Sequence, residues 1–258
     1  MNGRETELTQ RWEKLYSQSL GRELEYAVFG DDTAKKLCLA FPPQNGRFYD
    51  FHSFGMVETA APWIETGKLQ IVCPDGIDGE TWSDEGGDPR YRIELQERWY
   101  HHIVDELLPP FARAGGKAMV CGCSMGGVHA GNFFFRRPDL FDMMLSMSGL
   151  FNGQYFFHDY MDDLVYANSP VHFLPNMPEN HPWMTLYRQS TIILCVGQGA
   201  WEDDLLYGTR ELDAILTAKN IPHWADYWGY DVTHDWCWWQ KQFPYFLGHI
   251  IPIVRSAR

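Results

Sequence analysis

A serine between two closely spaced glycines is the strongest chemical signal in the sequence. Ser124 stands in the pattern Gly-x-Ser-x-Gly with Gly122 and Gly126, after a run at 118–121 that predicts a strand and before a stretch at 128–135 that predicts a helix. On a sharp strand-to-helix turn the residues two before and two after the serine must be tiny, because backbone segments approach there closely. Such a turn would hold the Ser124 hydroxyl above the sheet, at the positive end of the helix. The pattern predicts a nucleophile able to attack an ester carbonyl.

A serine hydroxyl needs a general base, and ten histidines compete for that role. His234 lies between a strand predicted at 224–228 and a helix predicted at 236–250, so it follows the carboxyl end of a strand. Parallel sheets bind ligands at that edge. We therefore expect His234 to be the base and the other histidines to be structural, apart from three in an insertion that could contact substrate: His158, His172 and His181.

The base needs a carboxylate to orient it, and in this kind of site the chain order is nucleophile, acid, base. Three consecutive carboxylates follow the strand predicted at 192–196, in a loop of the same sheet edge. We expect Glu202 to be the acid, with Asp203 and Asp204 as alternatives. Those not used would be surface charges stabilised at a helix N-terminus.

An oxyanion hole needs two backbone N–H groups directed at the developing negative charge. We expect one from Met125, which directly follows the nucleophile. The second should come from the loop after the strand predicted at 36–41, which begins with two prolines. Proline has no N–H, so the donor is Gln44 or Asn45, and we favour Gln44.

Short apolar runs alternate with helical stretches along the chain, which predicts an α/β fold with a mostly parallel sheet and helices on both faces. We expect one domain over 1–258, since no linker divides it. Strands are predicted at 24–29, 36–41, 69–73, 118–121, 143–147, 192–196 and 224–228. Helices are predicted in a stretch ending near residue 66 and at 92–114, 128–135, 209–219 and 236–250, while 7–19 is read as a short helix or an extended arm.

The segment 150–190 interrupts this alternation with four prolines and many aromatic residues. So long an insertion is typical of a lid or a binding loop. Aromatic rings here and in neighbouring loops are candidates for contacts with an aromatic or sugar group, although core packing explains them equally well. These candidate substrate-binding residues are Trp82, Phe156, Trp183 and Trp201.

The charge balance restricts the partners. With 34 acidic against 21 basic residues the net charge is −13, which disfavours nucleic acids and anionic membranes. No run approaches the roughly 20 apolar residues of a membrane span, and the start of the chain carries no apolar leader, so we expect a cytoplasmic protein.

The six cysteines lack metal-binding spacing, and we expect reduced structural thiols and no metal or organic cofactor. Homo-oligomerisation stays open.

Three segments carry a resemblance to a known family. The stretches GCSMGG from residue 122, GQGAWED from residue 197 and THDWCWW from residue 233 resemble the putative-esterase family of the α/β-hydrolase fold. This family includes S-formylglutathione hydrolases, enterochelin esterases and mycolyltransferases. The resemblance runs from about Leu24 to the C-terminus. It implies the same nucleophile, Ser124, and the same base, His234.

The resemblance implies two alignments of the acid. The pattern of the S-formylglutathione hydrolases falls on Glu202, and that of the mycolyltransferases falls on Asp203. The loop 75–84, with Trp82, is similar to a family loop near the substrate mouth. This chain departs from the secreted members at its start, so cell-wall acyl transfer is not expected, and its insertion matches no member closely enough to name a substrate.

The expected activity is therefore hydrolysis of a small, aromatic or sugar-linked carboxylic ester through an acyl-enzyme, with a small molecule as partner. Two alternatives remain from the sequence. The same triad would support acyl transfer to a bound alcohol, and a chain that kept the fold but lost catalysis would serve as a binding or scaffold protein.

Overall fold

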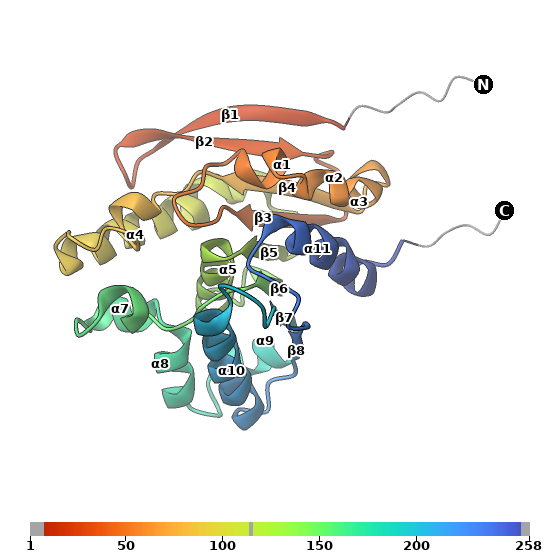
Figure 1. The fold of residues 1–258 in the computed structure, drawn as a ribbon. Coiled ribbons are helices and arrows are strands. Elements are labelled where there is room, and N and C mark those ends of the chain that lie inside the picture. The colour runs from red at the N-terminus through yellow and green to blue at the C-terminus, as the bar shows by residue number, and fades with distance from the viewer. Residues whose placement is uncertain (1–7, 114–115, 254–258) are drawn as a thin grey trace, which may run out of the picture.

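An eight-stranded β-sheet organises the residues that the computed structural model describes, 8–113 and 116–253 (Figure 1). Its spatial order is β1-β2-β4-β3-β5-β6-β7-β8. β1, β2 and β4 pair antiparallel, and from β4 onwards all neighbouring strands are parallel. The strands are β1 (Gln10–Ser17), β2 (Arg22–Phe29), β3 (Lys36–Phe41), β4 (Leu69–Pro74), β5 (Ala118–Cys123), β6 (Phe141–Met147), β7 (Thr191–Val196) and β8 (Trp224–Tyr227).

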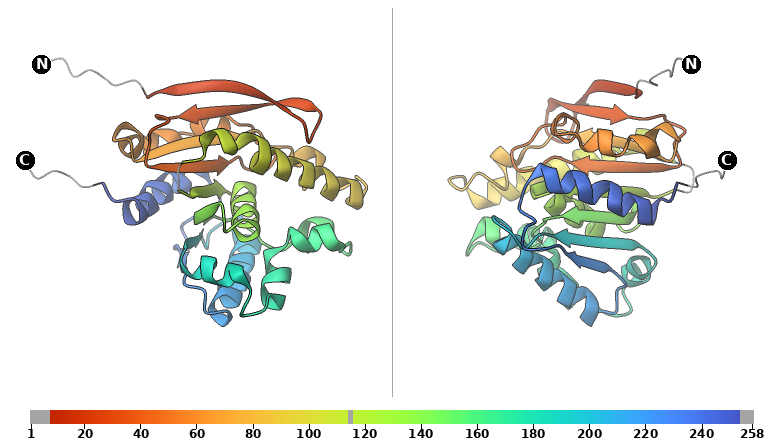
Figure 2. Two further views of the ribbon diagram at one scale, coloured as in Figure 1. Left: turned by 180° about the vertical axis from the view of Figure 1, so that it is seen from behind. Right: turned by 45° about the vertical axis from the view of Figure 1, so that its right-hand side comes forward.

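Helices cover both faces of the sheet, as Figure 2 shows from two sides. The side chains of β3 are apolar on both faces and need helices on both. Leu37, Leu39 and Phe41 are buried on one face, and Cys38 and Ala40 are buried on the other. A strand buried on both faces reads as a continuous apolar run. The predicted α/β class and mostly parallel sheet are therefore confirmed.

One face packs against α4 (Pro89–His101), α5 (Met125–Arg136), α8 (Pro170–Asn176), α9 (Pro182–Arg188) and α10 (Asp203–Ala218). The other packs against α1 (Asp50–Ser53), α2 (Met56–Thr59), α3 (Ala61–Glu65) and α11 (Trp236–Ile250). The segment predicted as an insertion contains α6 (Gln154–Phe157), α7 (Asp163–Ala167), α8 and α9 between β6 and β7. No helix among the described residues is long and apolar enough to cross a bilayer.

Two predicted elements differ from the structure in the kind of secondary structure that they form. The helix alternative for 7–19 is wrong, because residues 10–17 form β1, which pairs with β2 and alternates exposed with half-buried side chains. The helix predicted at 92–114 begins at Pro89 and leaves α geometry after His101. It continues as a π-helical turn over His102–Leu107 and ends in a 3₁₀ turn at Pro109–Phe111, where two prolines cannot continue the hydrogen bonding. Residue 114, its predicted end, lies outside the described residues.

Glu106, in the π-helical turn, anchors the turn between β1 and β2. Its carboxylate accepts hydrogen bonds from the Ser19 hydroxyl at 2.6 Å, the Ser19 N–H at 2.8 Å and the Gln18 N–H at 3.1 Å. His102 Nδ1 lies 3.0 Å from it. Burial opposes the charge of Glu106, but the bonds from Ser19 and His102 outweigh it and lower the pKa of Glu106 to about 2.

We predict that Glu106→Gln lowers the free energy of unfolding by about 2 kcal/mol near neutral pH. Because the folded-state pKa of Glu106 is depressed, its contribution is present above the unfolded-state pKa of about 4.3 and is lost as pH falls towards about 2. Urea unfolding of wild type and variant from about pH 6 to about pH 2 measures this difference. A difference independent of pH would contradict the prediction. Glu65→Gln, at an exposed position on α3, is the control and should stay within about 0.5 kcal/mol of wild type.

The turn between β5 and α5 is built on close backbone contact. A Cβ on Gly126 would lie 2.4 Å from the carbonyl oxygen of Phe41. A Cβ on Gly122 would lie 2.3 Å from the carbonyl carbon of Gly126. Only glycine fits at either position, so the turn that carries Ser124 is fixed against the end of β3.

Gly126→Ala should lower the free energy of unfolding by about 2 to 3 kcal/mol, because the added carbon must displace buried backbone rather than a flexible side chain. Gly86→Ala is the matched control, since a Cβ there meets no atom within 4 Å, and should change stability by no more than about 0.5 kcal/mol. Thermal and urea unfolding measure both. Equal stabilities for the two variants would show that the turn is not tightly packed.

Candidate active site

Ser124 occupies the strained turn at the amino end of α5. Its backbone has φ 57° and ψ −124°, which a residue other than glycine seldom adopts. The Ser124 N–H donates to the carbonyl of Met147, at the end of β6, at 2.9 Å. The hydroxyl therefore lies at the carboxyl edge of the sheet, beside the first turn of α5.

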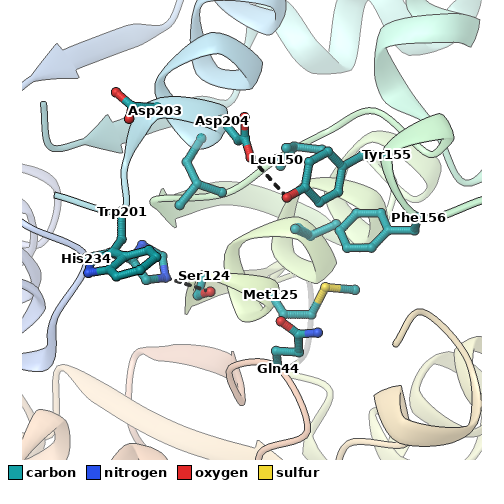
Figure 3. A pocket seen from close by; sticks show the side chains of 12 residues that line it. Gln44, Ser124, Met125, Leu150, Tyr155, Phe156, Trp201, Asp203, Asp204 and His234 are labelled. Atoms are coloured by element: carbon teal, nitrogen blue, oxygen red, sulfur yellow. Dashed lines mark hydrogen bonds between the residues drawn. The ribbon is translucent and has the colours of Figure 1, made fainter. Parts of the chain in front are cut away.

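His234 reaches Ser124 from the loop between β8 and α11. Its Nε2 lies 2.9 Å from the Ser124 Oγ, which is hydrogen-bonding distance (Figure 3). The His234 ring also packs at right angles against the Trp239 ring, with 4.8 Å between centroids. The structure thus brings together the two residues that the sequence predicts as nucleophile and base.

Backbone hydrogen bonds join the His234 loop to the loop after β7. The Gly199 N–H donates to the carbonyl of Val232 at 2.8 Å, and the His234 N–H donates to that of Ala200 at 3.1 Å. A Cβ on Gly197 would lie 2.3 Å from the Val232 carbonyl oxygen. These close contacts explain why Gly197 and Gly199 precede the carboxylates of the loop after β7. A side chain at either position would collide with the carbonyl of Val232.

Glu202 is the carboxylate that this contact places beside the imidazole. It precedes α10 and is only 1% exposed. Its Oε2 lies 3.6 Å from His234 Nδ1, slightly longer than a hydrogen bond. Within the described part of the chain neither atom has another hydrogen-bond partner. Because hydrogen bonds in unliganded catalytic sites are often long and tighten with substrate, this separation fits an orienting carboxylate.

Asp203 and Asp204, the alternative acids, begin α10 and are exposed. Both line the cavity next to Ser124, but neither forms an ion pair with His234 among the described residues. In Figure 3 the Asp203 carboxylate points away from the His234 ring. The helix begins at Asp203, six residues before its predicted start at Thr209.

Two buried residues that the sequence reasoning missed hold Glu202. The Ser148 hydroxyl donates to Glu202 Oε1 at 2.7 Å and accepts from Trp239 Nε1 at 3.3 Å. Ser148 directly follows β6 and has a φ of 55°. Its place at the carboxyl end of a central strand was an available signal. Trp239 lies in the THDWCWW stretch. The sequence showed a cluster of tryptophans there but not which of them holds Ser148.

A cavity of about 350 Å³ opens above Ser124 and His234. Two of the four aromatic candidates, Phe156 and Trp201, line it, as Figure 3 shows. Trp82 does not line it, since it is 2% exposed and packs edge-on behind Phe156 with 5.0 Å between ring centroids. Trp183 lies elsewhere, in a separate hollow with Tyr100 and Arg136. The cavity is lined by Gln44, Ser124, Met125, Val128, Leu150, Tyr155, Phe156, Trp201, Asp203, Asp204, Leu205 and His234.

The candidate oxyanion donors lie beside Ser124 in the same cavity. Met125 is the first residue of α5 and lines the cavity, as does Gln44. The Gln44 side chain donates to the Ser83 hydroxyl at 2.8 Å, so its own loop is tied to the loop after β4. Within the described residues the backbone N–H groups of Gln44 and Asn45 have no hydrogen-bond partner.

The thiol next to Ser124 is not a competing nucleophile. Cys123 is fully buried, and burial raises its pKa well above the ordinary value, so the reactive thiolate is disfavoured. Among the described residues no group of three or more histidine, cysteine or acidic side chains could hold a metal ion.

Solved structures share this fold. An S-formylglutathione hydrolase from Agrobacterium tumefaciens matches with a TM-score of 0.71 at 13% identity, over 94% of each chain. The ferulic acid esterase AmCE1/Fae1A of Anaeromyces mucronatus matches with a TM-score of 0.68 at 17% identity, over 98% of this chain and 94% of its own. FphF, a fluorophosphonate-binding serine hydrolase of Staphylococcus aureus, matches with a TM-score of 0.68 at 14% identity, over 95% and 98%. At such identities the likeness establishes the fold.

No curated protein sequence is similar enough to the chain to count as a match. The sequence model of one family, described as putative esterase, matches residues 51–250. This span contains the strained serine turn, the Glu202 loop and the His234 loop. The chain therefore belongs to the putative esterase family, with the α/β-hydrolase fold.

Proposed function

We propose that the protein is a serine carboxylic-ester hydrolase that works through an acyl-enzyme. The observation that carries the proposal is the 2.9 Å contact between the Ser124 hydroxyl and His234 Nε2, with the Glu202 carboxylate behind the ring. These are the geometric roles of a hydrolytic triad: nucleophile, base and orienting acid. The match to an esterase family supports the same reaction class.

In the proposed first step, Ser124 Oγ attacks the ester carbonyl while its proton passes to His234 Nε2. The tetrahedral oxyanion is bound by the backbone N–H groups of Met125 and Gln44. As the tetrahedral intermediate collapses, the ester C–O bond breaks and His234 donates its proton to the departing alkoxide, leaving alcohol and acyl-enzyme. Water then attacks the acyl carbon, gives a proton to His234, and the carboxylic acid leaves as Ser124 recovers its hydrogen. Protons balance, and no cofactor is required.

Glu202 has two effects in this scheme. Accepting a hydrogen bond from Nδ1 fixes the tautomer that leaves Nε2 free to take the serine proton. The buried negative charge also stabilises the imidazolium that forms during attack, and the effect is strong because Glu202 is almost fully removed from water.

The cavity supports hydrolysis of a small or aromatic ester. Its volume of about 350 Å³ suits a small molecule, and Phe156 and Tyr155 offer ring surface beside the nucleophile. Asp203 and the exposed Trp201 form a rim open to water. Easy entry of water favours hydrolysis over transfer to a bound alcohol, which needs a dry site.

A fluorophosphonate probe should label the wild-type protein, and Ser124→Ala should abolish labelling. Ser124→Ala should also lower kcat/KM for a p-nitrophenyl ester by about 10⁴-fold or more, because the remaining groups supply only binding and oxyanion stabilisation. Gel fluorescence and initial-rate kinetics measure these effects. A folded wild-type chain that is not labelled would favour the non-catalytic scaffold alternative.

Comparison of Glu202→Gln with Asp203→Asn separates the two candidate acids. We expect Glu202→Gln to lower kcat by about 10² to 10⁴-fold, because the amide cannot stabilise an imidazolium. Asp203→Asn should cost no more than about tenfold, because its carboxylate makes no ion pair with the imidazole. The reverse order of losses would reassign the acid to Asp203. Circular dichroism of both variants checks that each is folded.

A further inference from the structure

The wall of the catalytic cavity is acidic and aromatic. Among its described lining residues are two carboxylates, Asp203 and Asp204, and no lysine or arginine. Asp204 accepts a hydrogen bond from the Tyr155 hydroxyl at 3.1 Å (Figure 3). Burial and this hydrogen bond raise the pKa of Tyr155, so the phenol remains a neutral donor and leaves the charge of Asp204 uncompensated.

A second hollow of about 260 Å³ adjoins the first on the far side of this hydrogen bond. The two share Leu150, Tyr155 and Asp204, so the tyrosine–aspartate pair stands between them. Its other lining residues are Asn152, Gln154, Tyr207, Gly208 and Glu211. The two adjoining hollows define the path along α10 that a substrate reaching beyond Ser124 would follow.

The geometry of α10 places a third carboxylate, Glu211, in this path. Asp204, Gly208 and Glu211 recur at helical spacing and therefore share one face of the helix. Gly208 has no side chain to fill the hollow between the two acidic residues. A Cβ there would lie 3.1 Å from the Leu150 side chain. Glu211 Oε2 is buried and has no hydrogen-bond partner within the described part of the chain. A buried carboxylate oxygen without a donor favours a ligand that supplies a hydrogen bond or a positive charge.

Protein cations do not neutralise these carboxylates. No lysine or arginine in the described ranges forms an ion pair with Asp203, Asp204 or Glu211. Arg92 lies behind Phe156 and is 3% exposed, and its guanidinium donates to main-chain carbonyls. Arg210, also on α10, lies over the Tyr227 ring and lines neither hollow.

Exposed aromatic rings surround the same path. Trp201 is 86% exposed, Tyr207 is 70% exposed and Tyr155 is 52% exposed. Trp201 and Tyr155 line the first hollow, and Tyr155 and Tyr207 line the second. Large rings exposed beside uncompensated carboxylates suit a cationic ligand, because a ring face and a carboxylate both attract an ammonium group.

We propose that the substrate of this site is an ester that carries an ammonium group. The ester carbonyl lies at Ser124, and the ammonium group lies beyond Tyr155, between Asp204, Glu211 and the ring of Tyr207. The inference rests on the proposed function and specifies its substrate class. Esters that carry a carboxylate are disfavoured, because the path presents negative charge along its length.

The test compares two esters of the same shape and different charge. One is choline butyrate, and the other is the ester in which a tert-butyl carbon replaces the quaternary nitrogen. In a second pair, the trimethylammonium or the tert-butyl group stands at the end of the acyl chain of a p-nitrophenyl ester. Comparing the two pairs shows whether the cation belongs to the alcohol or to the acyl side of the substrate. We expect kcat/KM for the cation to exceed that for the neutral isostere by about tenfold in at least one pair at low salt. This preference should shrink as salt is added.

Variants then locate the preference. Asp204→Asn and Glu211→Gln should each lower the ratio of cationic to neutral kcat/KM by about threefold, and the double variant by more. Glu65→Gln, which removes the same charge from α3 and lines neither hollow, should leave the ratio unchanged. The ratio is internal to each variant, so a partial loss of folded protein does not affect it.

Fluorophosphonate labelling is measured on the same samples to separate the two proposals. If Ser124 is labelled but neither pair shows a preference for the cation, the ammonium proposal is overturned and the hydrolase proposal stands. A preference that survives in the double variant also overturns it. If Ser124 is not labelled and no ester is cleaved, the proposed function itself fails.

Discussion

The backbone of Ser124 has a conformation that a residue with a side chain adopts only when its surroundings enforce it. Those surroundings are the two strands beside β5. Gly126 touches the last carbonyl of β3, and the Ser124 N–H is bound by the last carbonyl of β6. Such strain costs about 1 to 3 kcal/mol, and the fully buried strands around it offset this cost. The backbone that carries the hydroxyl is therefore fixed before any substrate arrives.

The buried carboxylate of Glu202, next to the His234 ring, is held by a different set of contacts from those around Ser124. Burying a carboxylate is unfavourable unless hydrogen bonds and dipoles replace its water. Ser148 donates to one oxygen of Glu202, and the amino end of α10 lies directly after it. Trp239 orients Ser148 and also supports the His234 ring. One tryptophan thus couples the position of Glu202 to that of His234.

Much of this architecture could be predicted because central strands are buried on both faces and so appear as short apolar runs between helices. The strands at β3, β4, β5 and β7 were found within a few residues for that reason. The glycines around Ser124 and at Gly197 and Gly199 indicated close backbone contact and so the loops of the site. Local sequence could not show which tryptophans face the cavity. Trp82 and Trp183 are pulled away from it by tertiary packing, whereas Trp201 is held at its rim.

The N-terminal strand and the start of α10 were also hard to predict. Residues 10–17 alternate in exposure, but their mixed polar and aromatic side chains gave no clear period. Asp203 and Asp204 looked like loop residues, although acidic residues are stabilised in the first turn of a helix. The roles of Ser148 and Trp239 depend on contacts between residues 54 to 91 positions apart.

The position of β8 has a consequence for how the protein moves. β8 is a four-residue strand at the margin of the sheet and half-buried throughout, whereas β5 is interior and completely buried. Marginal segments open at lower free energy than interior ones, so amide hydrogens of β8 should exchange with deuterium before those of β5. His234 follows this marginal strand, whereas Ser124 follows a buried interior strand that should open at higher free energy. Brief departures of the imidazole would leave the serine turn intact, and the site would reassemble without refolding of the domain.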